Sequence, residues 1–207
     1  MKQWIKIVMI CAVAALLFGG VHQYRQQRMT EEIAGKIIRF HVRANSDTKE
    51  DQALKLKVRD AIGAYMQPKL SGISDIDISR KVVEENLKQV EHTASGVIVQ
   101  EGYTYEVKAS LTVTDFPEKT YGAYTFPAGK YEALEVVIGK GGGHNWWCVM
   151  YPNLCFFNST YEVVDQEAEK SLHQVLTEQE YQSLMEEKNY QVKFALLERI
   201  QEIFKNL

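Results

Sequence analysis

The sequence has few cysteines, few prolines and almost no excess of charge. Three cysteines in 207 residues exclude a disulfide-rich scaffold, and four prolines exclude a proline-rich linker. A net charge of −3 gives no electrostatic case for nucleic acid as a partner. The 45% of apolar and 25% of charged residues are typical of a globular protein. We therefore expect one ordinary folded domain.

The N-terminus also lacks an apolar run of full membrane-spanning length. Lys2 and Lys6 precede the uncharged segment 7–21, which is about 15 residues long, whereas a spanning helix needs about 20. The apolar region of a secretory signal has about 7–15 residues. Residues 1–29 are therefore predicted to be a signal peptide or a short membrane anchor, and cleavage stays open. Residues 30–207 are predicted to form a single extracytoplasmic domain.

Several segments carry the two-residue periodicity of β-strands. Apolar and basic residues alternate over residues 38–43, which predicts a strand with one buried face. Residues 103–113 alternate most regularly, and residues 131–138 and 146–150 are also predicted strands. Residues 116–124 are predicted to be a loop or a short strand.

Helical periodicity occupies other parts of the chain. A helix is predicted from Asp47 to about Gln67, capped by residues 45–47 and ended by Pro68. A second is predicted over 78–95, closed by Gly96. Thr177 and Glu180 have the spacing of a capping box that opens a third helix, and residues 192–204 are predicted to form a fourth. Together the segments predict an α+β fold, in which amphipathic helices pack on an antiparallel or mixed central sheet.

A glycine-rich loop at residues 139–143 precedes a block of aromatic residues and cysteines. The loop has neither the spacing nor the following helix of a phosphate-binding motif, so we favour a flexible hairpin connection. Cys148 and Cys155 could form a disulfide in an exported protein, or remain two buried thiols. With His144 they form an incomplete zinc set, and we expect neither a metal nor a cofactor.

Two other groups of residues could carry chemistry. Cys148 could be a nucleophile activated by His144 or His41, but its apolar neighbours would raise the thiol pKa, which favours a structural cysteine. Arg39, His41 and Arg43 form a basic row that could receive the carboxylates of a partner. We favour a solvated strand face for this row.

Three segments together resemble a known family. The first joins Ile-Arg-Phe-His-Val-Arg-Ala-Asn-Ser-Asp at 38–47 to a helix carrying Arg59 and Asp60; the second is Pro-Ala-Gly-Lys-Tyr-Glu-Ala-Leu at 127–134. The third is Gly-His-Asn-Trp-Trp-Cys-Val-Met-Tyr-Pro at 143–152, followed by Cys155. In this order they resemble stage II sporulation protein R of endospore-forming bacteria.

The resemblance implies a signalling role without catalysis. Proteins of this family are made in the forespore and exported to the space between the two membranes. There they are required to activate a membrane-embedded aspartic protease of the mother cell, which processes pro-sigma-E. The resemblance therefore implies that protease as the partner, and a location in the intermembrane space or on the outer face of the cell membrane. The N-terminal segment would provide the membrane contact, and the oligomeric state stays open.

The aromatic block suggests where a partner would bind. Exposed tryptophan and tyrosine often anchor protein interfaces. The predicted partner surface consists of His144, Asn145, Trp146, Trp147 and Tyr151. The alternative functions are an extracytoplasmic cysteine hydrolase that acts on envelope material through Cys148, and a structural envelope module.

Overall fold

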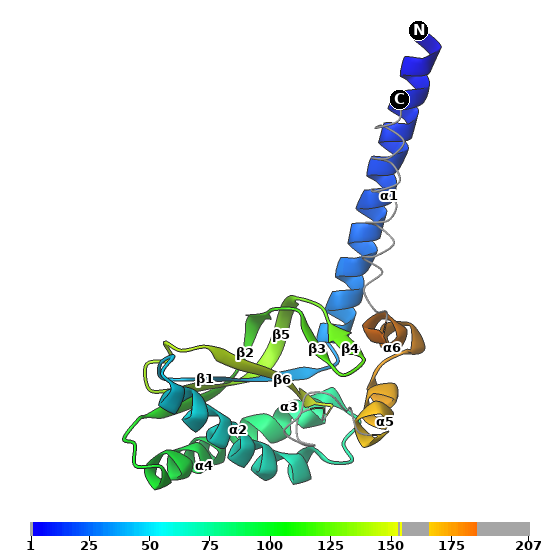
Figure 1. Cartoon of the computed structure of the whole chain (residues 1–207). Coiled ribbons are helices and arrows are strands. Elements are labelled where there is room, and N and C mark those ends of the chain that lie inside the picture. The colour runs from blue at the N-terminus through cyan, green and yellow to red at the C-terminus, as the bar shows by residue number, and fades with distance from the viewer. Residues whose placement is uncertain (1, 153, 155–165, 186–207) are drawn as a thin grey trace.

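The computed structural model describes residues 2–152, 154 and 166–185 (Figure 1). The described residues form an α+β fold with a mixed central sheet, as the sequence predicts. The elements are α1 (Lys2–Ala34), β1 (Ile38–Arg43), α2 (Lys49–Leu70), α3 (Ile76–Glu85), α4 (Leu87–Gln100), β2 (Val107–Phe116), β3 (Lys119–Tyr121), β4 (Tyr124–Phe126), β5 (Gly129–Ile138), β6 (Asn145–Tyr151), α5 (Gln166–Val175) and α6 (Glu178–Met185).

The central sheet has the strand order β2-β5-β1-β6. The first strand in sequence thus lies inside the sheet. β1 runs parallel to β5, with Phe40 opposite Leu134, and antiparallel to β6, with Phe40 opposite Cys148. β2 pairs antiparallel with β5. β1 is therefore an interior strand, with both of its edges paired to other strands. Its two faces are covered by elements outside the sheet.

Helices α2, α3 and α4 lie on one face of this sheet (Figure 1). The core between the layers includes Phe40 and Val42 of β1 and Leu54, Val58 and Ile62 of α2, none of which is more than 2% exposed. Full burial of one such side chain contributes roughly 1.5–3 kcal/mol. The alternating apolar side chains of β1 therefore pack against the apolar side chains that recur at helical spacing in α2. On the other side of the sheet lie the β3–β4 hairpin and the body-proximal end of α1 (Figure 1).

Four helix boundaries differ from the prediction. Thr48 caps α2 by accepting a hydrogen bond from the backbone N–H of Asp51, and Pro68 lies inside the last turn. The predicted single helix over 78–95 is wrong, because the chain breaks into α3 and α4 at Asn86, whose side chain amide donates to the carbonyl of Val82. Gly96 lies inside α4.

The strand predictions are largely confirmed. β5 and β6 cover residues 131–138 and 146–150, while β2 begins only at Val107. The segment 116–124 forms most of a separate two-stranded sheet, β3–β4. The capping box is confirmed: Thr177 N–H donates to Glu180 at 2.6 Å, and Glu180 N–H donates to the hydroxyl of Thr177 at 3.3 Å. The predicted helix over 192–204 lies outside the described residues.

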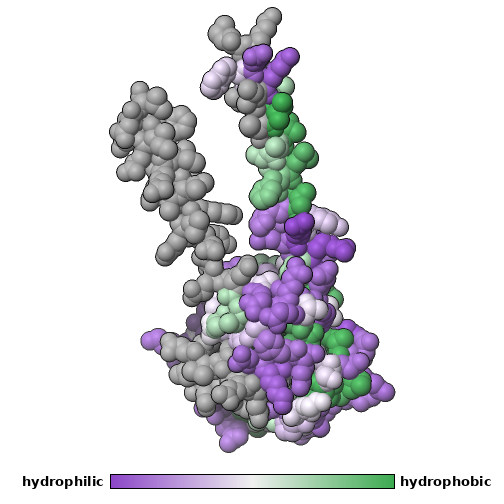
Figure 2. Space-filling view, turned by 90° about the vertical axis from the view of Figure 1, so that its right-hand side faces the viewer, coloured by the Kyte–Doolittle hydropathy of each residue, from purple (hydrophilic) through white to green (hydrophobic). Residues whose placement is uncertain are grey.

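Helix α1 extends through the predicted export segment and well past it. It runs for 33 residues and projects from the body (Figure 1). Apolar side chains gather along its distal part (Figure 2), and Leu16 and Phe18 are both 77% exposed. Among the described residues, no helix combines the length and apolar character needed to cross a membrane. The predicted membrane anchor is thus not confirmed.

Candidate functional site

The glycine-rich loop crosses the end of β1. β5 and β6 lie on opposite sides of β1, so the predicted hairpin connection between them is wrong. Gly142 N–H donates to the carbonyl of Asn45 at 3.1 Å, and Gly143 N–H donates to that of Ala44 at 3.0 Å. A Cβ atom on Gly143 would overlap the carbonyl of Ser46. The loop therefore needs glycine because two backbone segments touch there.

We call the contact between residues 44–47 and 139–145 the loop junction. A buried carboxylate holds its inner side: Asp51 accepts hydrogen bonds from the Asn45 amide at 2.8 Å and from the Ser46 hydroxyl at 2.5 Å. Burial raises the pKa of Asp51, but hydrogen bonds from Ser46, Asn45 and Tyr105 outweigh this and hold it below its usual range. Asp51 thus stays ionised and fixes the turn between β1 and α2.

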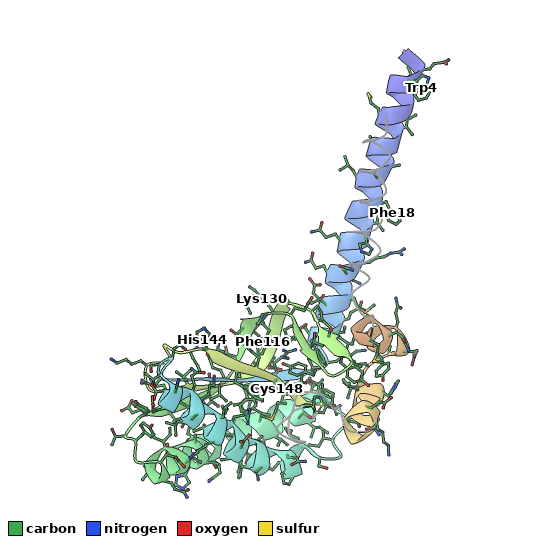
Figure 3. The ribbon with its side chains drawn as sticks, in the orientation of Figure 1. Trp4, Phe18, Phe116, Lys130, His144 and Cys148 are labelled. Carbon is green, nitrogen blue, oxygen red and sulfur yellow. The ribbon has the colours of Figure 1, made fainter. Side chains whose placement is uncertain are left out.

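An exposed histidine–aspartate pair forms the outer side of the loop junction (Figure 3, His144). The Asp47 carboxylate accepts from the backbone N–H of His144 at 2.6 Å and lies 2.5 Å from the ring Nδ1. These hydrogen bonds from His144 lower the pKa of Asp47. The side chains of His144 and Asp47 are 82% and 50% exposed. The pair is fixed by the backbone and open to solvent.

Cys148 does not provide a nucleophile for this pair. It is 2% exposed and disulfide-bonded, and an oxidised sulfur has no thiolate to attack a substrate. Its predicted partner Cys155 lies outside the described residues, so the Cys148–Cys155 pairing stays a prediction. The oxidised state argues against the cysteine-hydrolase alternative.

The five residues of the predicted partner surface do not share one face. Trp146 is 8% exposed and packs edge-on against Phe40, with ring centroids 5.7 Å apart, under α2. Tyr151 is also buried in the core. His144 is exposed, and Asn145 and Trp147 are half-buried. Strand alternation explains this correction, because successive side chains of β6 point to opposite faces of the sheet.

The basic row on β1 is covered, and the prediction of a solvated face is wrong. Arg39 and His41 are both 0% exposed. Only Arg43 reaches solvent, and its guanidinium lies 3.4 Å from the carboxylate of Glu135. The alternation was identified correctly, but β1 lies inside the sheet and its second face carries other aromatic residues. Because both side chains are fully buried, Arg39 and His41 do not contribute to the surface of the protein in this structure.

His41 is held neutral in this covered face. Its ring stacks on Trp147 with centroids 5.0 Å apart and planes 8° apart. Burial lowers its pKa to about 4, assisted by the positive charges of Arg43 and Arg39. Glu135 lies 3.7 Å from its Nε2 but also pairs with Arg43. The histidine is therefore a packing residue at neutral pH.

Arg39 is enclosed by aromatic rings, one of which is Phe116, labelled in Figure 3 on the side of the sheet away from α2. Its Cζ atom lies 4.6 to 5.8 Å from the centroids of Phe116, Tyr131, Phe126 and Tyr121. Its Nη2 donates to the Tyr121 hydroxyl at 3.3 Å, while Nε and Nη1 have no partner among the described residues. The cluster could not be predicted from the sequence, because Tyr121 and Phe126 reach Arg39 through the β3–β4 hairpin, whereas residues 116–124 are predicted only to be a loop or a short strand. Burial lowers the pKa of Arg39.

The described residues contain no group of three or more His, Cys, Asp or Glu side chains that could hold a metal ion. The loop junction instead presents a fixed polar surface of backbone amides, His144 and Asp47. Such a surface is suited to recognition of another molecule. Its two halves come from the two segments that are most distinctive in the sequence, residues 38–60 and 143–156.

Comparison with known proteins agrees with these distinctive segments. The family described as stage II sporulation protein R matches residues 34–161. Stage II sporulation protein R of Bacillus subtilis (strain 168) is 30% identical over 221 residues, covering 96% of this chain and 99% of that protein. No solved structure gives a significant match. The family is named for sporulation and not for an enzymatic activity. The chain therefore belongs to the stage II sporulation protein R family.

Proposed function

We propose that this protein is a signal exported from the forespore. In this proposal it binds a membrane-embedded aspartic protease of the mother cell and thereby promotes removal of the pro-sequence from pro-sigma-E. Family membership supports a role in stage II of sporulation. A bound signal can activate the protease only if it binds the active form more tightly than the inactive one. The relevant property of the protein is then a contact surface.

The loop junction is the observation that carries this proposal. His144 and Asp47 are exposed, yet backbone hydrogen bonds from Gly142, Gly143 and His144 hold the junction in place. A surface that is already ordered loses little conformational entropy when a partner binds. Lys140 extends this surface as an exposed cation. We propose that Lys140, His144 and Asp47 contact the protease, with Asn145 and Trp147 at the edge.

Two features support export. Cys148 is disulfide-bonded, and stable disulfides are typical of oxidising compartments outside the cytosol. The N-terminal segment has basic residues followed by an apolar stretch, and side chains such as Leu16 and Phe18 are exposed on α1. We propose that the body lies in the intermembrane space, either free or held at the outer face of the cell membrane.

A double variant tests the proposed contact surface. Lys140→Glu with His144→Glu reverses the charge or polarity of two exposed side chains without touching the core. We expect loss of pro-sigma-E processing, measured by immunoblot in sporulating cells whose own gene has been deleted. Lys81→Glu is the matched control, because Lys81 is also exposed but lies on α3, where Arg80 pairs with Glu132 near the start of β5, whereas the loop junction follows the end of β5. Normal pro-sigma-E processing by the double variant at equal protein level would exclude the loop junction as the contact surface for the protease.

A further inference from the structure

Among the described residues, no carboxylate forms an ion pair with the buried guanidinium of Arg39. In the part of the chain that the structure describes, this face of the sheet presents two guanidinium groups, those of Arg39 and Arg43, beside one carboxylate, that of Glu135. Glu135 lies 3.4 Å from Arg43 and forms no ion pair with Arg39. The only hydrogen bond of the Arg39 side chain among the described residues is the 3.3 Å contact with Tyr121. The Nε and Nη1 groups of Arg39 are therefore hydrogen-bond donors without an acceptor in the described part of the chain.

This arrangement is energetically unusual. Removing an ionised guanidinium from water is costly unless a counter-ion and hydrogen bonds compensate. The four aromatic rings return part of that cost through cation–π attraction. They do not accept the directed hydrogen bonds that Nε and Nη1 lose on leaving water. An entering carboxylate would supply both the missing charge and the missing acceptors.

The cover over Arg39 is the β3–β4 hairpin. Each of its strands has three residues, and they form a two-stranded sheet separate from the central sheet. Such a small sheet is marginally stable without support. Its support includes a 2.9 Å hydrogen bond from the Tyr121 hydroxyl to the carbonyl of Trp147 and a 2.7 Å bond between the hydroxyls of Tyr124 and Tyr181. Lifting the hairpin would withdraw two rings, Tyr121 and Phe126, from Arg39.

We propose that Arg39 is a receptor for a carboxylate carried by a partner polypeptide, and that the β3–β4 hairpin lifts to admit it. This inference rests on the proposed signalling function and deepens it by naming the chemistry that the partner brings. A carboxylate matches the planar guanidinium in shape and charge. The site offers one uncompensated positive charge, which suits a single monoanionic group. The bound carboxylate would also hold the hairpin open, so that binding and a change of shape are coupled.

The first test does not depend on the protease. The thermal unfolding midpoint of the full chain is measured in sodium acetate and in sodium chloride of equal ionic strength. Because acetate would bind the folded state only, the midpoint should rise with acetate beyond the effect of chloride. Arg39→Met should abolish this difference, whereas Arg59→Met should keep it. Arg59 is the matched control, since its Cζ also lies over an aromatic ring, 4.8 Å from the Trp146 centroid, but on the helix-covered face. Equal responses of all three proteins would overturn the proposal.

A looser cover should strengthen the acetate effect. Tyr124→Phe removes the hydroxyl that contacts Tyr181 while it retains the ring. If the hairpin must lift before a carboxylate enters, this variant should respond to acetate at lower concentrations than the parent protein. A response equal to that of the parent protein would contradict the role of the hairpin as a cover.

The second test measures signalling. Arg39→Met should lower pro-sigma-E processing at least about tenfold, which corresponds to about 1.4 kcal/mol of lost binding. Arg39→Lys retains the charge and should restore part of the activity, and Arg59→Met should process normally. Normal processing by folded Arg39→Met would overturn the carboxylate site. If processing does not depend on the protein at all, the proposed function fails, while the acetate response still reports on Arg39.

Discussion

Acidification should destabilise the protein through His41. The ordinary pKa of this histidine is 6.5, and burial among Arg39, Arg43 and Trp147 lowers it to about 4 in the folded state. Between these two values the unfolded chain binds a proton that the folded chain does not accept. The free energy of unfolding therefore falls as the pH drops through this window, and the loss levels off below about pH 4.

The size of the effect follows from the difference between the two pKa values. One pKa unit corresponds to about 1.4 kcal/mol, so a shift from 6.5 to about 4 gives a loss of about 3 kcal/mol. This is a large part of the 5–15 kcal/mol that is typical for a folded domain, roughly a fifth or more. The nearby carboxylate of Glu135 does not prevent the effect, because Arg43 shares it.

Urea unfolding from about pH 7 to about pH 4 measures this loss. The same series with His41→Gln isolates it, since glutamine is neutral throughout. Carboxylates with lowered pKa values, such as Asp51 and Glu180, contribute to both curves equally. The curve of the parent protein should fall more steeply than that of the variant, by about 3 kcal/mol over the window. Parallel curves would refute the neutral, buried state of His41.

Three further predictions follow from local contacts. Gly143→Ala should destabilise the protein by about 1–3 kcal/mol, because its Cβ would overlap the neighbouring backbone. Gly96→Ala inside α4 has open space around the new Cβ and should stabilise the protein by about 0.4–1 kcal/mol. Equal changes in the free energy of unfolding, measured with denaturant, would contradict the close backbone approach at Gly143. Lys36→Met should lower the free energy of unfolding by about 1–3 kcal/mol, since it leaves the buried carboxylate of Glu180 without its 2.6 Å ion pair. An unchanged denaturation midpoint would show that this ion pair does not contribute to stability. Reduction of the disulfide at Cys148 should lower stability by about 2–3 kcal/mol; peptide mapping of the oxidised chain identifies the bonded partner, and a free Cys148 thiol would reopen the hydrolase alternative.

Features with a local cause could be predicted from the sequence. The capping box at Thr177 and Glu180 depends on residues three positions apart, and its two hydrogen bonds form as expected. Strands β5 and β6 were likewise predictable, because each contains a short apolar run within its own segment. The break at Asn86 was missed because the apolar spacing continues on both sides of it. Its side chain is held by the Val82 carbonyl and the Tyr65 hydroxyl, and the second contact comes from another helix.

Features that depend on strand order could not be predicted. The alternation in β1 indicates two faces but not that both are covered, because the cover over Arg39 comes from Tyr121 and Phe126, far along the chain. The glycine-rich loop was correctly singled out, yet its crossing of β1 depends on which strands pair. The same reason explains why Trp146, predicted to contact a partner, is buried under α2.

Site-specific crosslinking tests the central claim most directly, namely that the protein acts by touching the protease through the loop junction. A photoreactive residue is placed at position 144 in sporulating cells, with the exposed position 81 on α3 as the control. We predict that the membrane-embedded aspartic protease is captured from position 144 and not from position 81. If the protein with the photoreactive residue supports pro-sigma-E processing but the protease is absent from the products at position 144, the account is contradicted.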